Sequence, residues 1–213
     1  MRDTASFIEF LLDQGVLQFG EFTLKSGRIS PYFFNLGELS SGSAFARLGD
    51  AYAETILASG IEFDVLFGPA YKGIPIAVAT ATALAAKGCD VGVAYNRKEA
   101  KTHGEGGMLV GAEVTGRVLL IDDVLTSGKA IREALALIAP TDSTIAGAVI
   151  AMDRQETGPE GGTAVAALAE DLGAPVISIA NLAGVIGYLD EGGYGTDDLR
   201  ARMRGYQAEY CVM

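Results

Sequence analysis

The sequence contains few of the residues and segments that mark whole classes of protein. Its 213 residues include only two cysteines, Cys89 and Cys211, whose spacing fits no metal-binding or redox motif. No apolar run approaches the length of a membrane span, and acidic residues interrupt the apolar stretch at the N-terminus, which excludes a signal peptide. Positive charge is scarce as well, with 16 lysines and arginines against 27 acidic residues and a net charge of −11. We therefore expect a soluble, cytoplasmic protein that binds neither nucleic acid nor membranes.

The remaining pattern is that of an ordinary globular domain without repeats or low-complexity tracts. From residue 42 onward, predicted helices alternate with short apolar strands: DVLFG, VGVAY, VLLID, TIAGAVIAM and PVISIA. Such strands are typical of a largely parallel central sheet covered by helices on both faces. A helix over 3–14 and two strand-like pieces, VLQFGEFTL and PYFFNL, precede them. We expect one α/β domain over 1–213, with a core from about 41–213 and a small N-terminal hood over about 1–40.

Polar and charged residues follow four of the predicted strands. They are Tyr71 and Lys72, then Arg97 to His103, then Asp122 to Lys129, and finally Arg154. Ligands of parallel sheets bind at the carboxyl ends of the strands. These loops are therefore expected to converge on one site.

The stretch VLLIDDVLTSGKA, residues 118–130, combines an apolar strand, two adjacent acids and a turn of small residues. The turn suits a phosphate, because backbone N–H groups and the positive end of a helix are available there. It is no nucleotide P-loop, because Asp123 occupies the place of the first glycine and Ala130 the place of the final Ser or Thr. The acids would repel a bare phosphate but suit the hydroxyls of a sugar phosphate and a nearby divalent metal. Taken alone, the acid pair is equally well explained as a solvated turn or a helix cap.

A polar segment over 97–108 gathers cations and the only histidine of the chain, His103. Its glycines supply hinge freedom, and its charge suits a small anionic ligand. We expect a mobile lid loop that closes over bound ligand. The alternative is a surface loop in which the histidine has no role.

These residues carry a resemblance to a known family. Residues 118–130 resemble the phosphoribosyl pyrophosphate motif of the type I phosphoribosyltransferases. FTLKSGRISPYFFN (22–35) resembles the N-terminal signature of the orotate phosphoribosyltransferases, GPAYKGIPIA (68–77) their pyrophosphate loop, and RKEAKTHGEGG (97–107) their mobile catalytic loop. The four motifs occur in the same order, and the similarity is weakest after residue 155.

The resemblance implies a type I phosphoribosyltransferase fold and a set of site residues. Catalytic roles would belong to Lys101, His103, Asp122 and Asp123. Contacts to phosphoribosyl pyrophosphate would come from Lys25, Tyr71, Lys72, Arg97, Lys98, Lys101, His103, Asp122, Asp123, Val124, Leu125, Thr126, Ser127, Gly128, Lys129 and Ala130. Contacts to orotate would come from Phe33, Phe34, Thr126 and Arg154. Mg²⁺ would be held mainly by the substrate, near the acid pair. The family's lid reaches into the neighbouring subunit's site, which implies a homodimer.

The residues themselves support part of this picture. Successive side chains of a strand point to opposite faces, so Phe33 and Phe34 cannot both be core. One is expected to cover a flat heterocycle, unless the pair simply packs a hairpin onto the sheet. Arg154 suits the carboxylate of orotate, or is a surface arginine beside Asp153.

The expected activity is transfer of a phosphoribosyl group to orotate, giving orotidine 5′-monophosphate and pyrophosphate in pyrimidine biosynthesis. Two alternatives stay open. One is an enzyme that uses a purine or another base, against which the two adjacent phenylalanines argue. The other is a regulator that binds phosphoribosyl pyrophosphate without catalysis, against which the lid cations and the lack of a basic arm argue.

Overall fold

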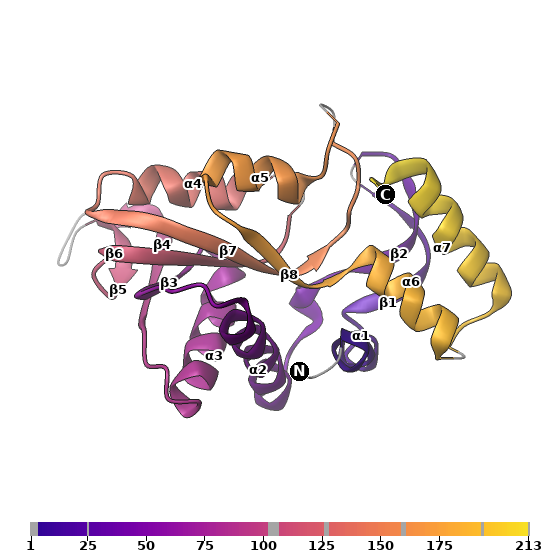
Figure 1. Ribbon diagram of the computed structural model, residues 1–213, viewed down its shortest axis with the longest axis horizontal. Coiled ribbons are helices and arrows are strands. Elements are labelled where there is room, and N and C mark those ends of the chain that lie inside the picture. The colour runs from indigo at the N-terminus through magenta and orange to yellow at the C-terminus, as the bar shows by residue number, and fades with distance from the viewer. Residues whose placement is uncertain are drawn as a thin grey trace.

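The computed structural model describes residues 4–24, 26–101, 107–125, 128–158, 161–192 and 194–212, and of Ala100, Lys101 and Lys129 it describes the backbone alone. Figure 1 shows a central sheet at one end and a smaller lobe, which contains both the first and the last elements, at the other. In chain order the elements are α1 (Thr4–Asp13), β1 (Leu17–Thr23), β2 (Ile29–Phe34), the short 3-10 helix η1 (Leu36–Glu38), α2 (Gly42–Ser59), β3 (Val65–Gly68), α3 (Gly73–Ala86), β4 (Gly92–Lys101), β5 (Gly107–Gly111), β6 (Gly116–Val124), α4 (Lys129–Ile138), β7 (Ser143–Asp153), α5 (Ala164–Leu172), β8 (Val176–Asn181), α6 (Leu182–Glu191) and α7 (Asp197–Tyr210).

The central sheet has the strand order β5-β4-β3-β6-β7-β8. Every neighbouring pair is parallel except β4 and β5, which are antiparallel. From β3 the chain moves outward to β4, and it later crosses back to form β6 on the other side of β3. The loops that follow β3 and β6 therefore lead away from each other, which leaves a crevice at the carboxyl ends of these strands. Ligands of such sheets bind at this switch point.

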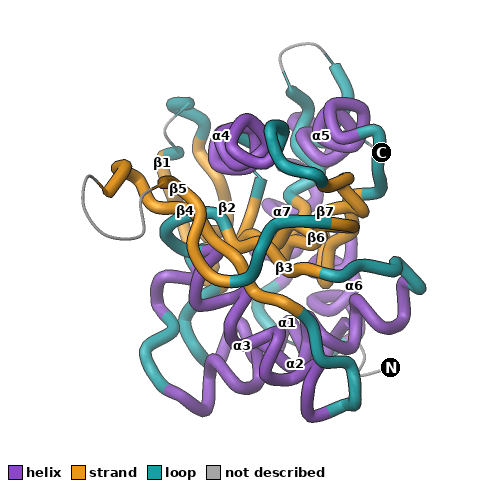
Figure 2. Tube along the Cα trace, turned by 90° about the vertical axis from the view of Figure 1, so that its left-hand side faces the viewer, coloured by secondary structure: helices purple, strands orange, loops and turns teal. Residues whose placement is uncertain are grey.

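Helices cover both faces of the sheet, as the apolar strands predicted. Figure 2 shows α4 and α5 on one side and α2 and α3 on the other. Within β6, Leu119 and Ile121 belong to the core cluster under α2 and α3, whereas Val118 and Leu120 belong to the cluster under α4 and α5. Burial on both faces explains why these strands are apolar throughout rather than alternating.

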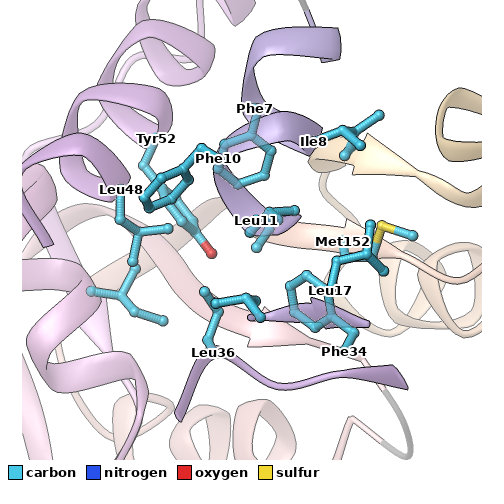
Figure 3. Packing of buried hydrophobic residues seen from close by; sticks show 14 of the residues in the cluster. Phe7, Ile8, Phe10, Leu11, Leu17, Phe34, Leu36, Leu48, Tyr52 and Met152 are labelled. Carbon is cyan, nitrogen blue, oxygen red and sulfur yellow. The ribbon is translucent and has the colours of Figure 1, made fainter. Parts of the chain in front are cut away.

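The N-terminal hood is a separate two-stranded sheet, β1 and β2, with α1 beside it. Phe7, Phe10 and Leu11 are buried, as expected from their positions on one face of α1. They pack with residues of the hood, of α2 and of β7, so the hood and the sheet share one core (Figure 3). The hood also packs on α7, where the rings of Tyr32 and Tyr206 meet edge to face at 5.9 Å.

The segment 97–108 was expected to be a lid loop, but both of its ends belong to strands. Strand β4 continues to Lys101, and β5 begins at Gly107 and pairs back on it, with Asn96 opposite Leu109. Only residues 102–106 of the segment lie outside the described residues, His103 among them. The charges suggested a loop, but they lie where β4 continues past the end of β3 and pairs with β5 alone, so charged side chains can stay in solvent there. Within the described residues, no helix is long and apolar enough to span a membrane.

Candidate active site

The loop between β3 and α3 is drawn tightly against the neighbouring strand. A Cβ on Gly68 would lie 2.2 Å from the Gly73 carbonyl oxygen, and a Cβ on Gly73 would lie 2.9 Å from the Ile121 carbonyl oxygen of β6. Because such contacts leave no room for a side chain, both positions require glycine. The buried Asn96 of β4 holds the middle of the loop, since its Oδ1 accepts from the Ala70 N–H at 2.9 Å. The peptide bond between Ala70 and Tyr71 is cis.

The two acids lie inside the end of β6 rather than in the turn that follows it. Asp122 and Asp123 are each 7% exposed. Each carboxylate accepts from the next backbone N–H, Asp122 Oδ1 at 3.0 Å and Asp123 Oδ1 at 2.7 Å. From α2, the buried hydroxyl of Tyr52 donates to the Asp122 carbonyl oxygen at 2.7 Å. These contacts hold the pair rigidly, which argues against a solvated turn.

Lys72 connects the acid pair with the loop after β3 and with the hood. Its Nζ donates to Asp123 Oδ2 at 2.7 Å and to Oδ1 of Asn35, just past β2, at 3.2 Å. The lysine side chain is 51% exposed, whereas that of Asp123 is 10% exposed. The crevice between β3 and β6 therefore contains a buried carboxylate paired with an accessible ammonium.

Among the described residues, Asp122 has no ion pair like that of Asp123. Burial, and then repulsion from Asp123, raise the pKa of the Asp122 carboxyl to about 7, although Lys72 and Lys98 partly oppose this. A ligand that donates hydrogen bonds or brings positive charge would stabilise the ionised form of this carboxyl.

Arg97 and Lys98 are neighbours in β4 and lie on opposite sides of that strand. Lys98 faces the acid pair; its Nζ lies 6.0 Å from the ring centre of Tyr71 and 3.5 Å from Glu133 Oε2. Arg97 instead donates from Nη1 to the Gly107 carbonyl oxygen at 3.3 Å, across the β4–β5 hairpin. The expectation that Arg97 joins the acid pair of its own chain is therefore not met. The alternation of side chains along a strand is the reason.

The phosphate turn is described only in part. Gly128 has the left-handed φ of 63° and precedes α4, and among the described residues no side chain caps the first turn of that helix. The first-turn N–H groups of α4 thus fit the expected anion site. Thr126, Ser127 and Lys25 lie outside the described residues, as do the side chains of Lys101 and Lys129. Leu125 is buried in the core, so only its backbone and that of its neighbours Val124 and Ala130 could serve a ligand.

Arg154, just past β7, takes part in a cluster of charged and aromatic side chains. Its Nε and Nη2 both donate to Glu156 Oε1, at 2.8 and 2.6 Å. Its guanidinium carbon lies 4.5 Å from the centre of the Tyr32 ring. The arginine side chain is 11% exposed, so it is not the solvated surface residue of the alternative interpretation.

The phenylalanine pair divides between two faces of β2. Phe34 is 6% exposed and belongs to the core, whereas Phe33 is 37% exposed and stacks on Phe22 at 5.4 Å. Tyr32, beneath Arg154, lies on the buried face with Phe34. The structure therefore does not bring the Phe33 ring and Arg154 to one face of the strand.

Sequence reasoning missed the residues that hold these groups in place. Tyr52, Asn96, Asn35 and Glu156 each contact a predicted site residue or its loop. A polar residue within an apolar segment was the only available signal, and it occurs at Asn96 directly after the strand VGVAY.

The acid pair also fits the expected metal. Among the described residues, no group of three or more His, Cys, Asp and Glu side chains could hold an ion alone. Mg²⁺ commonly takes one or two carboxylates and completes its shell with substrate phosphates and water. Asp122 and Asp123 match that donor set.

Comparison with known proteins identifies the family. The model of the phosphoribosyl transferase domain matches residues 35–165. Orotate phosphoribosyltransferase of Pseudomonas fluorescens is 55% identical over 208 residues, and that of Vibrio cholerae is 54% identical over 207 residues, each covering 97% of both chains. The crystal structure of orotate phosphoribosyltransferase from Francisella tularensis superposes with a TM-score of 0.88 at 41% identity, covering 97% of this chain and 100% of that one. This chain therefore belongs to the orotate phosphoribosyltransferase family.

Proposed function

We propose that this protein transfers the phosphoribosyl group of phosphoribosyl pyrophosphate to orotate, giving orotidine 5′-monophosphate and pyrophosphate. The observation that carries the proposal is the junction of Lys72 and Asp123, 2.7 Å apart at the switch point between β3 and β6. A cation that suits a phosphate lies there beside carboxylates that suit a ribose, which supports the proposal. Near full-length relatives with this activity support the choice of orotate over a purine.

The donor would bind along the ends of β3 and β6. Its 5′-phosphate would accept from the N–H groups at the start of α4, after Gly128, and from Thr126 and Ser127. Asp122 and Asp123 would accept from the ribose hydroxyls. Lys72, Tyr71 and Lys98 would then face the pyrophosphate, with Lys25 and Lys129 adding charge.

In the reaction, the bond from the anomeric carbon to the pyrophosphate oxygen breaks as the bond to the orotate nitrogen forms. The pyrophosphate leaves with the electron pair of the broken bond, and the nitrogen of anionic orotate supplies the pair for the new one. The acid pair stabilises the positive charge that develops on the ribose ring, and the lysines stabilise the leaving group. Asp122 and Asp123 would help to hold Mg²⁺, whose charge would offset that of the pyrophosphate.

The acceptor would lie at the end of β7 beneath the hood. Arg154 would bind its carboxylate, and Thr126 and Phe34, which shares the buried face of β2 with Tyr32, would form the surrounding wall, whereas Phe33 lies on the opposite face of that strand. The neighbouring strands β6 and β7 pair up to Val124 and Met152, so acceptor and donor would lie side by side.

We further propose that the protein is a homodimer in the cytoplasm, with residues 97–108 shared between subunits. The direction of Arg97, away from the acid pair of its own chain, supports sharing, because this side chain is then available to a neighbour. Lys101 and His103 would act on the pyrophosphate in that site. Replacing Lys101 by Ala should lower turnover by about 10²-fold, or about 2.7 kcal/mol, the usual effect of one well-placed electrostatic group.

The test follows the ultraviolet absorbance of orotate mixed with phosphoribosyl pyrophosphate, Mg²⁺ and purified protein. A magnesium-dependent fall in the orotate signal, absent when Asp122 and Asp123 are both changed to Asn, is the expected result. If orotate stays unchanged while uracil or a purine base is converted, that base is the acceptor instead of orotate. Binding of the donor without any turnover would indicate a regulator.

A further inference from the structure

The loop after β7 presents Arg154 through an unusual backbone turn. Gln155 has a φ of 55°. Among the described residues it is the only one other than glycine with a positive φ. A side chain is unfavourable in this conformation, so it persists only where the surroundings enforce it. Here the backbone N–H of Gln155 donates to Asp153 Oδ1 at 2.8 Å, and its side-chain Oε1 accepts from the Ala183 N–H of α6 at 2.8 Å. The turn brings Arg154 and Glu156 side by side.

Glu156 restrains one edge of the Arg154 guanidinium. The Nε and Nη2 groups define that edge, and both donate to Glu156 Oε1. The two hydrogen bonds to Glu156 do not use Nη1. Because a guanidinium is planar and carries its N–H groups in fixed directions, the edge formed by Nη1 and Nη2 stays available for a carboxylate. The Tyr32 ring beneath the guanidinium removes the remaining freedom to tilt.

Helix α7 in turn holds Glu156. The hydroxyl of Tyr206 donates to the same Oε1 at 2.6 Å, so three hydrogen bonds converge on one oxygen. Burial, and then the bond to Glu156, raise the pKa of Tyr206 to about 12, which keeps the hydroxyl protonated as a donor. The end of α7 and the residues after it also pair with the loop that follows β7. The Thr157 N–H donates to the Tyr210 carbonyl at 2.7 Å, and the Val212 N–H donates to the Gln155 carbonyl at 3.0 Å.

The charges of this cluster suit an anionic ligand. Arg28 of the hood lies 4.0 Å from the second oxygen of Glu156, so two arginines share one carboxylate. Arg154, Arg28 and Glu156 together carry one positive charge, although Arg154 is already paired, and Asp153 adds a carboxyl at the start of the turn. A ligand carboxylate would complete it.

We propose that Glu156 and Tyr206 are positioning residues, which orient Arg154 for the carboxylate of the acceptor. This inference rests on the proposed function, in which Arg154 contacts orotate. It assigns the C-terminal helix a role in acceptor affinity and specificity, while the donor is bound by β3, β6 and α4. Neither Glu156 nor Tyr206 touches the reacting atoms.

The test measures steady-state constants for both substrates in Tyr206→Phe and Glu156→Gln. Loss of one hydrogen bond to a charged group should raise the KM for orotate by about three- to tenfold in Tyr206→Phe, and by about tenfold in Glu156→Gln. The KM for phosphoribosyl pyrophosphate should stay within about twofold, because its contacts lie on other strands. Tyr188→Phe on α6 and Glu170→Gln on α5 are the matched controls, each outside this cluster, and should leave both constants unchanged.

A double-mutant cycle separates positioning from general support of the fold. In the background of Arg154→Ala, Glu156→Gln should have no further effect on orotate binding, because there is no guanidinium left to orient. Equal rises in both KM values, or an undiminished effect of Glu156→Gln without Arg154, would overturn the proposal. Thermal unfolding of each variant shows that the folded protein is being compared.

The activity of the wild-type protein and of Arg154→Ala separates a failure of the proposed function from a failure of the role assigned to Glu156 and Tyr206. If it fails to convert orotate, the proposed function and this inference fall together. If it converts orotate and Arg154→Ala raises the KM for orotate while Glu156→Gln and Tyr206→Phe do not, the function stands and the inference is wrong.

Discussion

Two aspartates at opposite ends of β3 and β6 show how differently one residue type is used in this protein. Asp64, just before β3, accepts from the Nε, Nη2 and backbone N–H of Arg117 at 3.1, 3.1 and 2.8 Å. These hydrogen bonds lower the pKa of its carboxyl to about 2. Asp122, at the carboxyl end of β6, is buried beside another acid, and the pKa of its carboxyl is raised to about 7.

At the amino ends of β3 and β6 the charge of Asp64 is paired within the fold. At their carboxyl ends the two acids are paired only in part. Asp64 has its partner within the fold and needs no ligand. Asp122 and Asp123 share the nearby lysines and leave charge uncompensated. Groups with raised pKa values cluster at functional sites, which favours the carboxyl ends of these strands as the place of the proposed reaction.

The largest effect should come from the acid paired with Lys72. Asp123→Asn keeps the shape of the side chain but removes the charge beside the developing cation. We expect turnover to fall by about 10²- to 10³-fold, or about 2.7–4 kcal/mol. Steady-state assays of orotate conversion measure this, with Asp64→Asn as the control at the other end. Comparable losses in both variants would contradict the division between the two ends.

The next largest effect concerns stability and pH in Asp122→Asn. The folded protein holds the Asp122 proton more tightly than the unfolded chain does, since the pKa rises from near 4 to about 7. The contribution of this group to stability is therefore complete below pH 4 and is lost as the pH rises through 7. We expect Asp122→Asn to be more stable than wild type at pH 8, by something on the order of a few kcal/mol, and similar to it at pH 4.

Urea unfolding at both pH values checks this expectation. A variant that was less stable than wild type at pH 8 would show that Asp122 is stabilised, not strained, in its charged form.

A smaller effect should follow from crowding the loop between the two strands. In Gly73→Ala the new Cβ would lie 2.8 Å from Pro69 Cδ and 2.9 Å from the Ile121 oxygen, so the loop must move away from β6. We expect a loss of about 1–3 kcal/mol in the free energy of unfolding, together with weaker donor binding.

Gly187→Ala provides the matched comparison, because nothing lies within 4 Å of a Cβ at this position of α6. Without a Cβ clash, alanine should stabilise the helix by roughly 0.5–1 kcal/mol. Thermal unfolding of the two variants should give shifts of opposite sign. A shift of the same sign in both would mean that the loop adjusts freely.

The smallest effect is expected for Asp64→Asn, and its pH dependence should be opposite to that of Asp122→Asn. Because the pKa of Asp64 is lowered in the folded state, its contribution to stability is present above pH 4 and is lost as the pH falls through 2. The variant should therefore be less stable than wild type at pH 7, and the difference should narrow at pH 3. Activity should be retained wherever the protein is folded. A difference independent of pH would point to packing rather than charge.

The layers of the fold could be predicted from the sequence because most of the central strands, β3, β6, β7 and β8, are largely apolar on both faces. The turn at Gly128 was predictable as well, since strand, acids and glycine follow one another directly in the chain. The β4–β5 hairpin was not predicted, because the charged residues at 97–101 extend β4 beyond the end of β3 and resemble a loop in the sequence.

Long-range polar contacts account for the rest of what was missed. Tyr52 and Asp122 are 70 residues apart, and Tyr206 and Glu156 are 50 residues apart. A tyrosine on a helix indicates neither its partner nor the direction of its hydroxyl. Such pairs depend on how helices lie on the sheet, which local patterns do not specify.

The contact between the hood and α7 has a consequence for biosynthesis. Arg202 Nη1 donates to the Gly20 carbonyl oxygen at 3.2 Å, although the two residues are 182 positions apart. Chains emerge from the ribosome with the N-terminus first, and an isolated hairpin is barely stable. The hood strands are thus among the first parts to be made and among the last to be secured. The neighbouring strands of the acid pair, β3 and β7, are made before α7, so the β3–β6 part of the proposed donor site can form before the hood and the proposed acceptor site are secured.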